Sequence, residues 1–323
     1  MKAVLLEGNA LNPGDISWSP IEEVAETVIY GSTTEEEMWD RLGDADIVYV
    51  NKLPITEAVL ERFPNIRYIG ECATGYNNID IEAAAKRGIP VTNVPAYSTA
   101  SVVQHTMAFI LDMASRITEH VNSVAAGDWC RSSQFCYWLN APMELEGKTL
   151  GIYGFGNIGR GVAKAAEVFG MKVLVYTAHP DKYREYESEN LRLVSEDELY
   201  READIITYHC PLTPATTGIV NNETMAKMKD GVFIVNAARG GVVNEAELAA
   251  ALKSGKVAGY ASDAAIKEPI NADCPLLDAP NVYFTPHIAW ASTEARKRLL
   301  SVMGSNAAAW IAGNPVNVVN GVK

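Results

Sequence analysis

Short runs of apolar residues alternate with amphipathic stretches in the first part of the chain. Such runs are typical of buried strands, whereas apolar residues spaced three or four positions apart indicate helices. The predicted strands are Ala3–Leu6, Asp46–Val50, Arg67–Ile69 and Pro90–Thr92, and the predicted helices are Glu35–Leu42, Thr56–Arg62 and Ile81–Lys86. This alternation predicts a parallel sheet covered by helices.

A longer amphipathic stretch follows, and Ser98 or Thr99 can cap its beginning. Its apolar residues recur at every third or fourth position, at Met107, Ile110, Met113, Ile117, Val121 and Val124. This spacing predicts one long helix that leads from a first domain into a second.

Beyond this helix, strands and helices alternate again. The predicted strands are Thr149–Tyr153, Lys172–Tyr176, Asp204–Tyr208, Val232–Val235, Val257–Ala261 and Val282–Phe284. Strands in this arrangement indicate a doubly wound parallel domain built on six strands. The last helical stretch, Thr293 to Ile311, follows the final strand, and we expect it to return to the first domain.

Length and charge narrow the class of protein. A chain of 323 residues, 48% of them hydrophobic, can bury sizeable cores and favours two domains. Its formal net charge of −13 disfavours nucleic acid and anionic membranes as partners. The strand-like residues Met1 to Gly8 predict neither a signal peptide nor a membrane-spanning helix, so we expect a cytoplasmic protein.

The cysteines predict neither a disulfide framework nor a metal site. There are five, widely scattered in a long chain, which favours reduced thiols. Cys130 and Cys136 have no histidine nearby and match no common zinc spacing, so we expect no bound metal.

A glycine-rich segment carries the first chemical signal. Gly154-Phe155-Gly156-Asn157-Ile158-Gly159 directly follows a predicted strand and opens a helix, which is the context of a dinucleotide-binding loop. The glycines permit a tight turn, and the amides of Asn157 and Ile158 would face the pyrophosphate. The alternative is a glycine turn with a purely structural role.

The residue expected to hold the adenosine ribose is unusual. A typical NAD site has an acidic residue after its second strand, but this chain has Thr177 there. A 2′-phosphate would meet no negative charge, and His179, Lys182 or Arg184 could lie near it. The cofactor is therefore NAD or NADP, with the preference left open; in the simpler alternative Thr177 only hydrogen-bonds the ribose.

Polar residues follow successive strands of the second domain. Cys210 comes after the third predicted strand, Arg239 after the fourth, Asp263 to Glu268 after the fifth and His287 after the sixth. Because the carboxyl ends of parallel strands meet at one edge, we expect these side chains to lie together where ligands bind.

This combination suits the reduction of a 2-keto acid. The reaction needs a cation for the carboxylate, a hydride donor, and an acid that protonates the carbonyl oxygen. Arg239 and His287 could supply the cation and the acid, and Glu268 beside the imidazole would favour its protonated form and fix its orientation.

These motifs resemble those of the D-isomer-specific 2-hydroxyacid dehydrogenases, nearest to the glycerate dehydrogenase or hydroxypyruvate reductase branch. The resemblance spans essentially the whole chain and rests, besides the glycine loop, on Thr74-Gly75-Tyr76-Asn77-Asn78-Ile79-Asp80, Asn236-Ala237-Ala238-Arg239-Gly240-Gly241, Glu268-Pro269 and Pro286-His287-Ile288-Ala289-Trp290. It implies a homodimeric enzyme that acts on a small 2-keto or 2-hydroxy acid such as hydroxypyruvate or glyoxylate.

The resemblance also implies roles for single residues. Arg239 would bind the substrate carboxylate and carbonyl, Glu268 would pair with His287, and His287 would transfer the proton. Lys52, Thr74 and Gly75 would join Arg239 in binding substrate. The cofactor would contact Thr74, Gly154, Gly156, Asn157, Ile158, Gly159, Thr177, Cys210, Ala237, Ala238, Arg239, Asp263 and His287, with Asp263 orienting the nicotinamide amide.

The fold that the resemblance implies has two doubly wound parallel-sheet domains. A Rossmann NAD(P)-binding domain, residues 99–291, is inserted into a flavodoxin-like substrate-binding domain, residues 1–98 plus 292–323, with the active site in a closing cleft between them. Gln104 departs from the family, where many members have glutamate.

Several readings stay open. His105, inside the long helix, is expected to be a satisfied core or interdomain histidine without a chemical role. The aromatic segment from Trp129 to Leu139 is expected to pack on a partner subunit, and an intrachain contact is the alternative. For function, the alternatives are a non-catalytic dinucleotide-sensing scaffold, or phosphoglycerate or phosphite dehydrogenase on the same fold.

Overall fold

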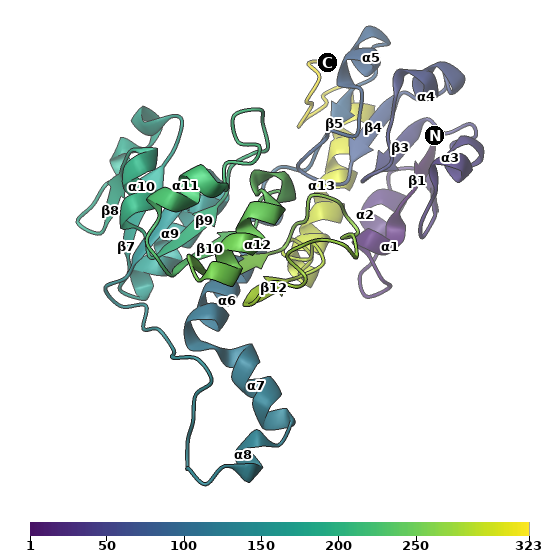
Figure 1. The fold of residues 1–323 in the computed structure, drawn as a ribbon. Coiled ribbons are helices and arrows are strands. Elements are labelled where there is room, and N and C mark those ends of the chain that lie inside the picture. Colours follow the sequence, from purple (N-terminus) through teal and green to yellow (C-terminus); the bar gives the residue numbers. More distant parts are fainter. Residues whose placement is uncertain (323) are drawn as a thin grey trace. The chain divides into compact units, whose positions relative to one another are not determined.

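The computed structural model describes residues 1–322, which divide into two compact units (Figure 1). Unit 1 contains Met1–Ser98 and the chain from Trp290 onward, and unit 2 contains Thr99–Ala289. The sheets of both units are entirely parallel. The predicted α/β class, with two doubly wound domains, is confirmed.

Unit 1 is a five-stranded sheet in the order β2-β1-β3-β4-β5, the flavodoxin-like order. Its strands are β1 (Lys2–Leu5), β2 (Glu26–Ile29), β3 (Ile47–Val50), β4 (Tyr68–Glu71) and β5 (Val91–Thr92). Its helices are α1 (Gly8–Leu11), α2 (Ser19–Glu22), α3 (Glu35–Arg41), α4 (Glu57–Arg62), α5 (Ile81–Lys86) and α13 (Thr293–Ile311). The predicted helices are confirmed, and their starts are explained by side-chain caps at Thr34, Thr56, Asp80 and Ser292.

The sequence analysis missed one strand of unit 1. β2 pairs only with β1 and forms an edge of the sheet, and its residues alternate between exposed and partly buried. A strand that is not buried on both faces lacks the continuous apolar run that identified its neighbours.

Unit 2 is a seven-stranded sheet in the order β12-β11-β10-β9-β6-β7-β8, which is doubly wound from β6. Its strands are β6 (Thr149–Tyr153), β7 (Lys172–Tyr176), β8 (Leu191–Leu193), β9 (Ile205–Tyr208), β10 (Val232–Asn236), β11 (Val257–Ser262) and β12 (Val282–Phe284). The prediction of six strands was wrong, because the apolar run of the edge strand β8 is interrupted by the exposed Arg192.

Helices cover both faces of this sheet. On one face, α6 (Thr99–Ser115) and α9 (Asn157–Val168) pack on side chains such as Leu150 and Ile152. On the other, α10 (Glu196–Glu202), α11 (Asn222–Lys227) and α12 (Glu245–Ser254) pack on side chains such as Tyr153 and Tyr208. Alternate residues of each strand thus enter different cores, and the carboxyl ends of the strands remain available for ligands.

The single long helix predicted between the domains was wrong. Arg116 adopts a left-handed φ of +56° and separates α6 from α7 (Ile117–Ala125), which is followed by α8 (Asp128–Arg131). Asp112 accepts hydrogen bonds from the backbone amide and the hydroxyl of Thr118, which fixes the new direction. Beyond the break the apolar side chains, among them Val121, are exposed and do not continue the buried stripe.

Two further observations bear on the predicted environment. None of the helices described for residues 1–322 has both the length and the apolar character needed to cross a membrane. All five cysteines are free thiols, and Cys130 and Cys136 are exposed.

Candidate active site

The glycine loop lies tightly against the carboxyl end of the unit 2 sheet. Gly154 has a φ of +99°, and a Cβ atom there would lie 2.9 Å from backbone atoms of His209 and Cys210, just after β9. A Cβ atom on Gly159 would lie 2.3 Å from the carbonyl oxygen of Gly154. Only glycine fits at these two positions, because the chain turns sharply while helix and strand approach closely.

The amino end of α9 is open toward an anionic group. Gly156 caps the helix without a side-chain hydrogen bond, and a Cβ atom built on it would meet no atom within 4 Å. The following amides, of Asn157 and Ile158, lie at the positive end of the helix dipole. The predicted loop therefore fits the pyrophosphate of a dinucleotide.

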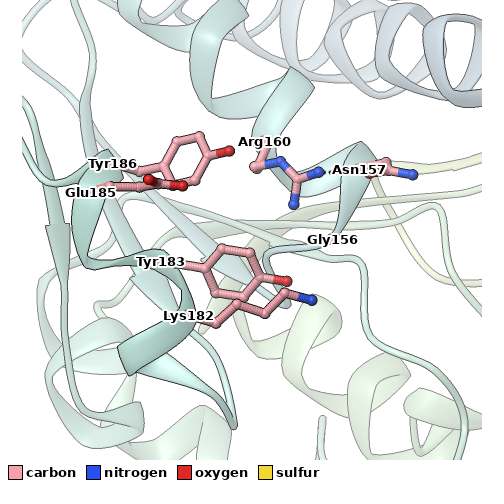
Figure 2. A pocket seen from close by; sticks show the side chains of 7 residues that line it. All are labelled: Gly156, Asn157, Arg160, Lys182, Tyr183, Glu185 and Tyr186. Carbon is pink, nitrogen blue, oxygen red and sulfur yellow. Dashed lines mark hydrogen bonds between the residues drawn. The ribbon is translucent and has the colours of Figure 1, made fainter.

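A pocket of about 370 Å³ lies beside this helix end (Figure 2). It is lined by the glycine loop, by α9 and by the 3₁₀ helix η1 (Pro180–Tyr186) that follows β7. The lining contains the cations of Arg160 and Lys182, the carboxylate of Glu185 and the rings of Tyr183 and Tyr186. Gly156 and Asn157, at the start of α9, complete it. Such a lining suits the phosphates and the flat base of a nucleotide.

Arg160 is a residue of this pocket that the sequence analysis did not identify. Its guanidinium donates hydrogen bonds to the Phe155 carbonyl at 3.3 Å and to Asn157 Oδ1 at 2.6 Å. It also lies over the rings of Tyr183 and Tyr186, so that the cation is held in place (Figure 2). In the sequence, only its position directly after Gly159 indicated that Arg160 could line the cofactor site.

Thr177 directly follows β7, three residues before η1, at the position where a typical NAD site has a carboxylate. Its hydroxyl accepts a hydrogen bond of 3.3 Å from the amide of His179. Lys182 lies with its ammonium over the Tyr183 ring and lines the pocket. Position 177 itself therefore carries no negative charge that would repel a 2′-phosphate.

Asp263 organises the segment that carries His287. Its carboxylate, only 4% exposed, accepts hydrogen bonds from Thr285 Oγ1 at 2.6 Å and from the amides of Ile288 and Ala289 at 2.8 and 2.7 Å. Because the Thr285 hydroxyl gives its proton to Asp263, His105 Nε2 donates to Thr285 Oγ1 at 2.9 Å, which fits the supporting, non-chemical role expected for it. The predicted contact of Asp263 with the nicotinamide stays a prediction.

His287 and Glu268 form the pair that the sequence predicts. His287 Nδ1 lies 2.7 Å from Glu268 Oε2, and the other carboxylate oxygen of Glu268 accepts the amide of Ala265 at 3.2 Å. His287 has a left-handed φ of +55°, and its side chain is 31% exposed. Because Nδ1 faces the carboxylate, Nε2 is left to exchange a proton with a ligand.

Arg239 is exposed at the same edge and forms no ion pair with any of the residues 1–322. Its loop is held by Asn236, which accepts a hydrogen bond from the Ala238 amide and donates one to the Arg239 carbonyl. A Cβ atom on Gly240 would lie 2.0 Å from the backbone of Ala265, so glycine lets the Arg239 loop approach the loop of Glu268. The sequence did not show this close approach.

Two other titratable side chains, Cys210 and His209, follow β9 at this edge. Burial raises the pKa of the Cys210 thiol to about 11, and burial lowers the pKa of His209 to about 4, so both are neutral near pH 7. Within residues 1–322, no three histidine, cysteine or acidic side chains gather as metal ligands. The catalytic roles of Arg239, Glu268 and His287 stay predictions.

The other predicted substrate residues lie in unit 1, at the carboxyl ends of its strands. Lys52 is exposed and follows β3, and its amide donates to the Glu7 carboxylate at 2.9 Å. Thr74 and Gly75 follow β4, and the Thr74 hydroxyl donates to the Val94 carbonyl at 2.8 Å. Within unit 1 these residues share one edge of the sheet, and their contact with substrate stays a prediction.

Comparison with known proteins agrees with this geometry. Residues 107–289, which cover most of unit 2, match the family described as "D-isomer specific 2-hydroxyacid dehydrogenase, NAD binding domain". A hydroxypyruvate reductase of Blautia hydrogenotrophica is 47% identical over 323 residues, 99% of this chain and 100% of that protein. A glycerate dehydrogenase of Methylorubrum extorquens is 39% identical over 90% of each chain.

Solved structures are similar along the whole chain. The D-lactate dehydrogenase of Aquifex aeolicus, determined with NAD and lactic acid, has a TM-score of 0.82 and 29% identity. The match covers 98% of this chain and 99% of that one. The likeness therefore extends to the sheets of both units.

Proposed function

This chain belongs to the D-isomer-specific 2-hydroxyacid dehydrogenases, and we propose that it reduces hydroxypyruvate to its D-2-hydroxy acid, or a 2-keto acid of similar size such as glyoxylate to the corresponding 2-hydroxy acid. It is an oxidoreductase that uses NAD or NADP. The observation that carries the proposal is the His287–Glu268 pair, 2.7 Å apart, at the sheet edge that also presents the exposed cation of Arg239. Its relatives named hydroxypyruvate reductase and glycerate dehydrogenase support this choice of substrate.

Each residue has a task that follows from its contacts. The nicotinamide, when bound, supplies a hydride to C2 of the keto acid. Arg239 holds the carboxylate of the substrate in a fork of parallel hydrogen bonds. His287 gives its Nε2 proton to the carbonyl oxygen, which becomes the hydroxyl group, while the Glu268 carboxylate accepts the Nδ1 hydrogen bond and holds the ring in this orientation. In the oxidation direction the neutral imidazole takes the proton back.

The test of the proposal is turnover of a panel of keto acids. Hydroxypyruvate, glyoxylate, pyruvate and a branched keto acid are each mixed with NADH and, separately, with NADPH, and the loss of reduced-nicotinamide absorbance is followed. We expect hydroxypyruvate or glyoxylate to give the highest kcat/KM. A clear preference for the branched acid would overturn the proposed substrate.

The residue at position 177 should decide cofactor preference. We expect the wild type to use NADH and NADPH with kcat/KM values of the same order. Thr177→Asp should lower kcat/KM for NADPH by at least about tenfold, because a carboxylate near a 2′-phosphate costs more than 1.4 kcal/mol in repulsion. Thr177→Asn is the matched control, since it has the shape of Asp without its charge and should leave the NADPH to NADH ratio within a few-fold of the wild type. An unchanged ratio in Thr177→Asp would contradict this assignment.

We also propose that the enzyme is a homodimer in the cytoplasm, assembled through the arm formed by residues 117–139. In Figure 1 this arm, with α7 and α8, extends away from the sheet of unit 2. It exposes large apolar side chains in one stretch of chain, at Ile117, Val121, Val124, Trp129, Phe135, Trp138 and Leu139. A patch of this kind is typical of a protein interface. The free cysteines support a reducing compartment.

Substituting Phe135 and Trp138 with serine should convert the dimer to a monomer in size-exclusion chromatography with light scattering. Their side chains are 87% and 66% exposed, so the change should not disturb the core of unit 2. Val168→Ser, at an apolar residue 82% exposed on α9, is the control and should remain dimeric. A wild type that is monomeric at micromolar concentration would rule the proposal out.

A further inference from the structure

A buried carboxyl group in unit 1 has no part in the mechanism described so far. Glu71 is the last residue of β4, and its side chain is fully buried. Its Oε2 atom accepts a hydrogen bond of 3.1 Å from Asn78 Nδ2, whereas Oε1 is buried without a hydrogen-bond partner among residues 1–322. Burying a carboxyl oxygen without a hydrogen-bond partner costs free energy, which indicates that Glu71 has a specific role.

The neighbours of Glu71 connect the two loops that follow β3 and β4. The Glu7 carboxylate accepts the backbone amides of Asn51, Lys52 and Leu53, which fixes the loop after β3. Asn78, in the loop after β4, donates to Glu71 and also to the Leu53 carbonyl at 3.2 Å. The Asn78 carbonyl in turn accepts the amide of Ile55 at 2.9 Å. One network of hydrogen bonds thus joins both loops.

These are the loops that carry Lys52 and, four residues before Asn78, Thr74. We propose that Glu71 is a positioning residue for substrate, which through Asn78 holds the loop of Lys52 and the loop of Thr74 and Gly75 in register. The inference rests on the proposed function, because it is the family resemblance that assigns substrate to these three residues. Glu71 itself touches no reacting atom.

Burial keeps Glu71 a neutral acid near pH 7. Burial raises the pKa of Glu71 to about 9, and the nearby Glu7 carboxylate raises this pKa as well. The hydrogen bond from Asn78 and the cation of Lys52 act to lower it. The adjacent Cys72 is also neutral, because burial and the two nearby glutamates raise its pKa. Ionisation would place a second carboxylate beside Glu7 and weaken the arrangement that holds Lys52.

The consequence is a pH dependence of substrate affinity with a defined sign. Because the folded-state pKa lies above the ordinary carboxyl value, the competent neutral form is present below about pH 9 and is lost above it. At pH 10 about nine-tenths of the molecules would carry the charge. If only the neutral form binds well, the apparent KM should rise roughly tenfold between pH 7 and pH 10.

Two variants separate this role from a merely structural one. Glu71→Gln keeps the shape and the acceptor for Asn78 but cannot ionise, so with hydroxypyruvate its KM at pH 7 should match the wild type. Across pH 7 to 10 the ratio of wild-type to variant KM should then rise about tenfold, because both proteins share every other titrating group. Glu71→Leu fills similar space without accepting a hydrogen bond and should raise KM several-fold at all pH values with kcat nearly unchanged.

A flat ratio of wild-type to Glu71→Gln KM over this pH range would overturn the inference, as would a Glu71→Leu enzyme with normal KM. Infrared spectroscopy adds a readout that does not depend on turnover. The wild type at pH 7 should show the C=O band of a protonated carboxylic acid that Glu71→Gln lacks, and absence of this band would also overturn it. A protein that shows the band but reduces no keto acid would refute the proposed function instead.

Discussion

Replacing His287 with Gln should lower kcat for keto-acid reduction by about 10²- to 10⁴-fold, the usual contribution of a positioned general acid. The physical reason is that Nε2 is the ring nitrogen left to give a proton to the carbonyl oxygen, since Nδ1 faces Glu268 at 2.7 Å. The amide of Gln cannot give up a proton at neutral pH. The dissociation constant of NADH, measured by fluorescence titration, should stay within about twofold, because the glycine loop and its pocket are unchanged.

His120→Gln is the matched control for this substitution. His120 lies on α7, where its ring is bound to the Arg116 carbonyl at 2.7 Å, and loss of this imidazole should leave kcat unchanged. Near-normal turnover by His287→Gln, with folding and cofactor binding intact, would show that the proton comes from another group.

Replacing Arg239 with Ala should lower kcat/KM for the keto acid roughly 30-fold to several thousand-fold. This corresponds to a loss of about 2–5 kcal/mol in binding of the transition state. The guanidinium is the exposed cation at this edge and has no ion-pair partner among the described residues, so it is free to bind the substrate carboxylate. Steady-state kinetics with hydroxypyruvate measure the effect. The change at Arg239 should not unfold the protein, because the Asn236 side chain still hydrogen-bonds the loop backbone at Ala238 and residue 239.

Arg239→Lys and Arg192→Ala complete this experiment. Lys keeps the charge but loses the planar fork of donors, so Arg239→Lys should fall between the wild type and Arg239→Ala. Arg192, on β8, forms a surface ion pair with Glu198. Removing this arginine should leave kcat/KM unchanged. An Arg239→Ala enzyme with unchanged kcat/KM would remove Arg239 from the site.

The strands that the sequence predicted are those with a continuous apolar run. β6, β7 and β12 occupy the predicted residues, and the run is readable even in β12, a three-residue edge strand of intermediate burial. The missed strands lack such a run, because β2 alternates between exposed and partly buried residues and β8 is interrupted by the exposed Arg192. The break at Arg116 was also hidden, since a left-handed residue other than glycine leaves no mark in hydrophobic periodicity.

The candidate site was predictable to the extent that it follows from strand ends. Because the carboxyl ends of parallel strands meet, Arg239, Glu268 and His287 could be assigned to one edge before any distance was known. The supporting contacts could not be predicted. The hydrogen bonds of Asp263 to the Ile288 and Ala289 amides and the approach of Gly240 to Ala265 depend on loop conformations, which have no periodic pattern.

The burial of Glu71 could not be predicted from the sequence either. A glutamate at the end of a short strand reads as a solvent-facing residue, and nothing in the chain before the fold is known indicates that it is fully buried. Only the structure brings Glu7, Asn78 and Glu71 together from three separate segments.

The central claim is that this chain reduces a small 2-keto acid with His287 as the proton donor. The most direct test is to follow reduced-nicotinamide absorbance with hydroxypyruvate for the wild type and His287→Gln side by side, with the chirality of the product determined. The account predicts rapid formation of the D-hydroxy acid by the wild type and a rate lower by about a hundredfold or more for the variant. Formation of the L-isomer, or equal rates for the two proteins, would contradict it.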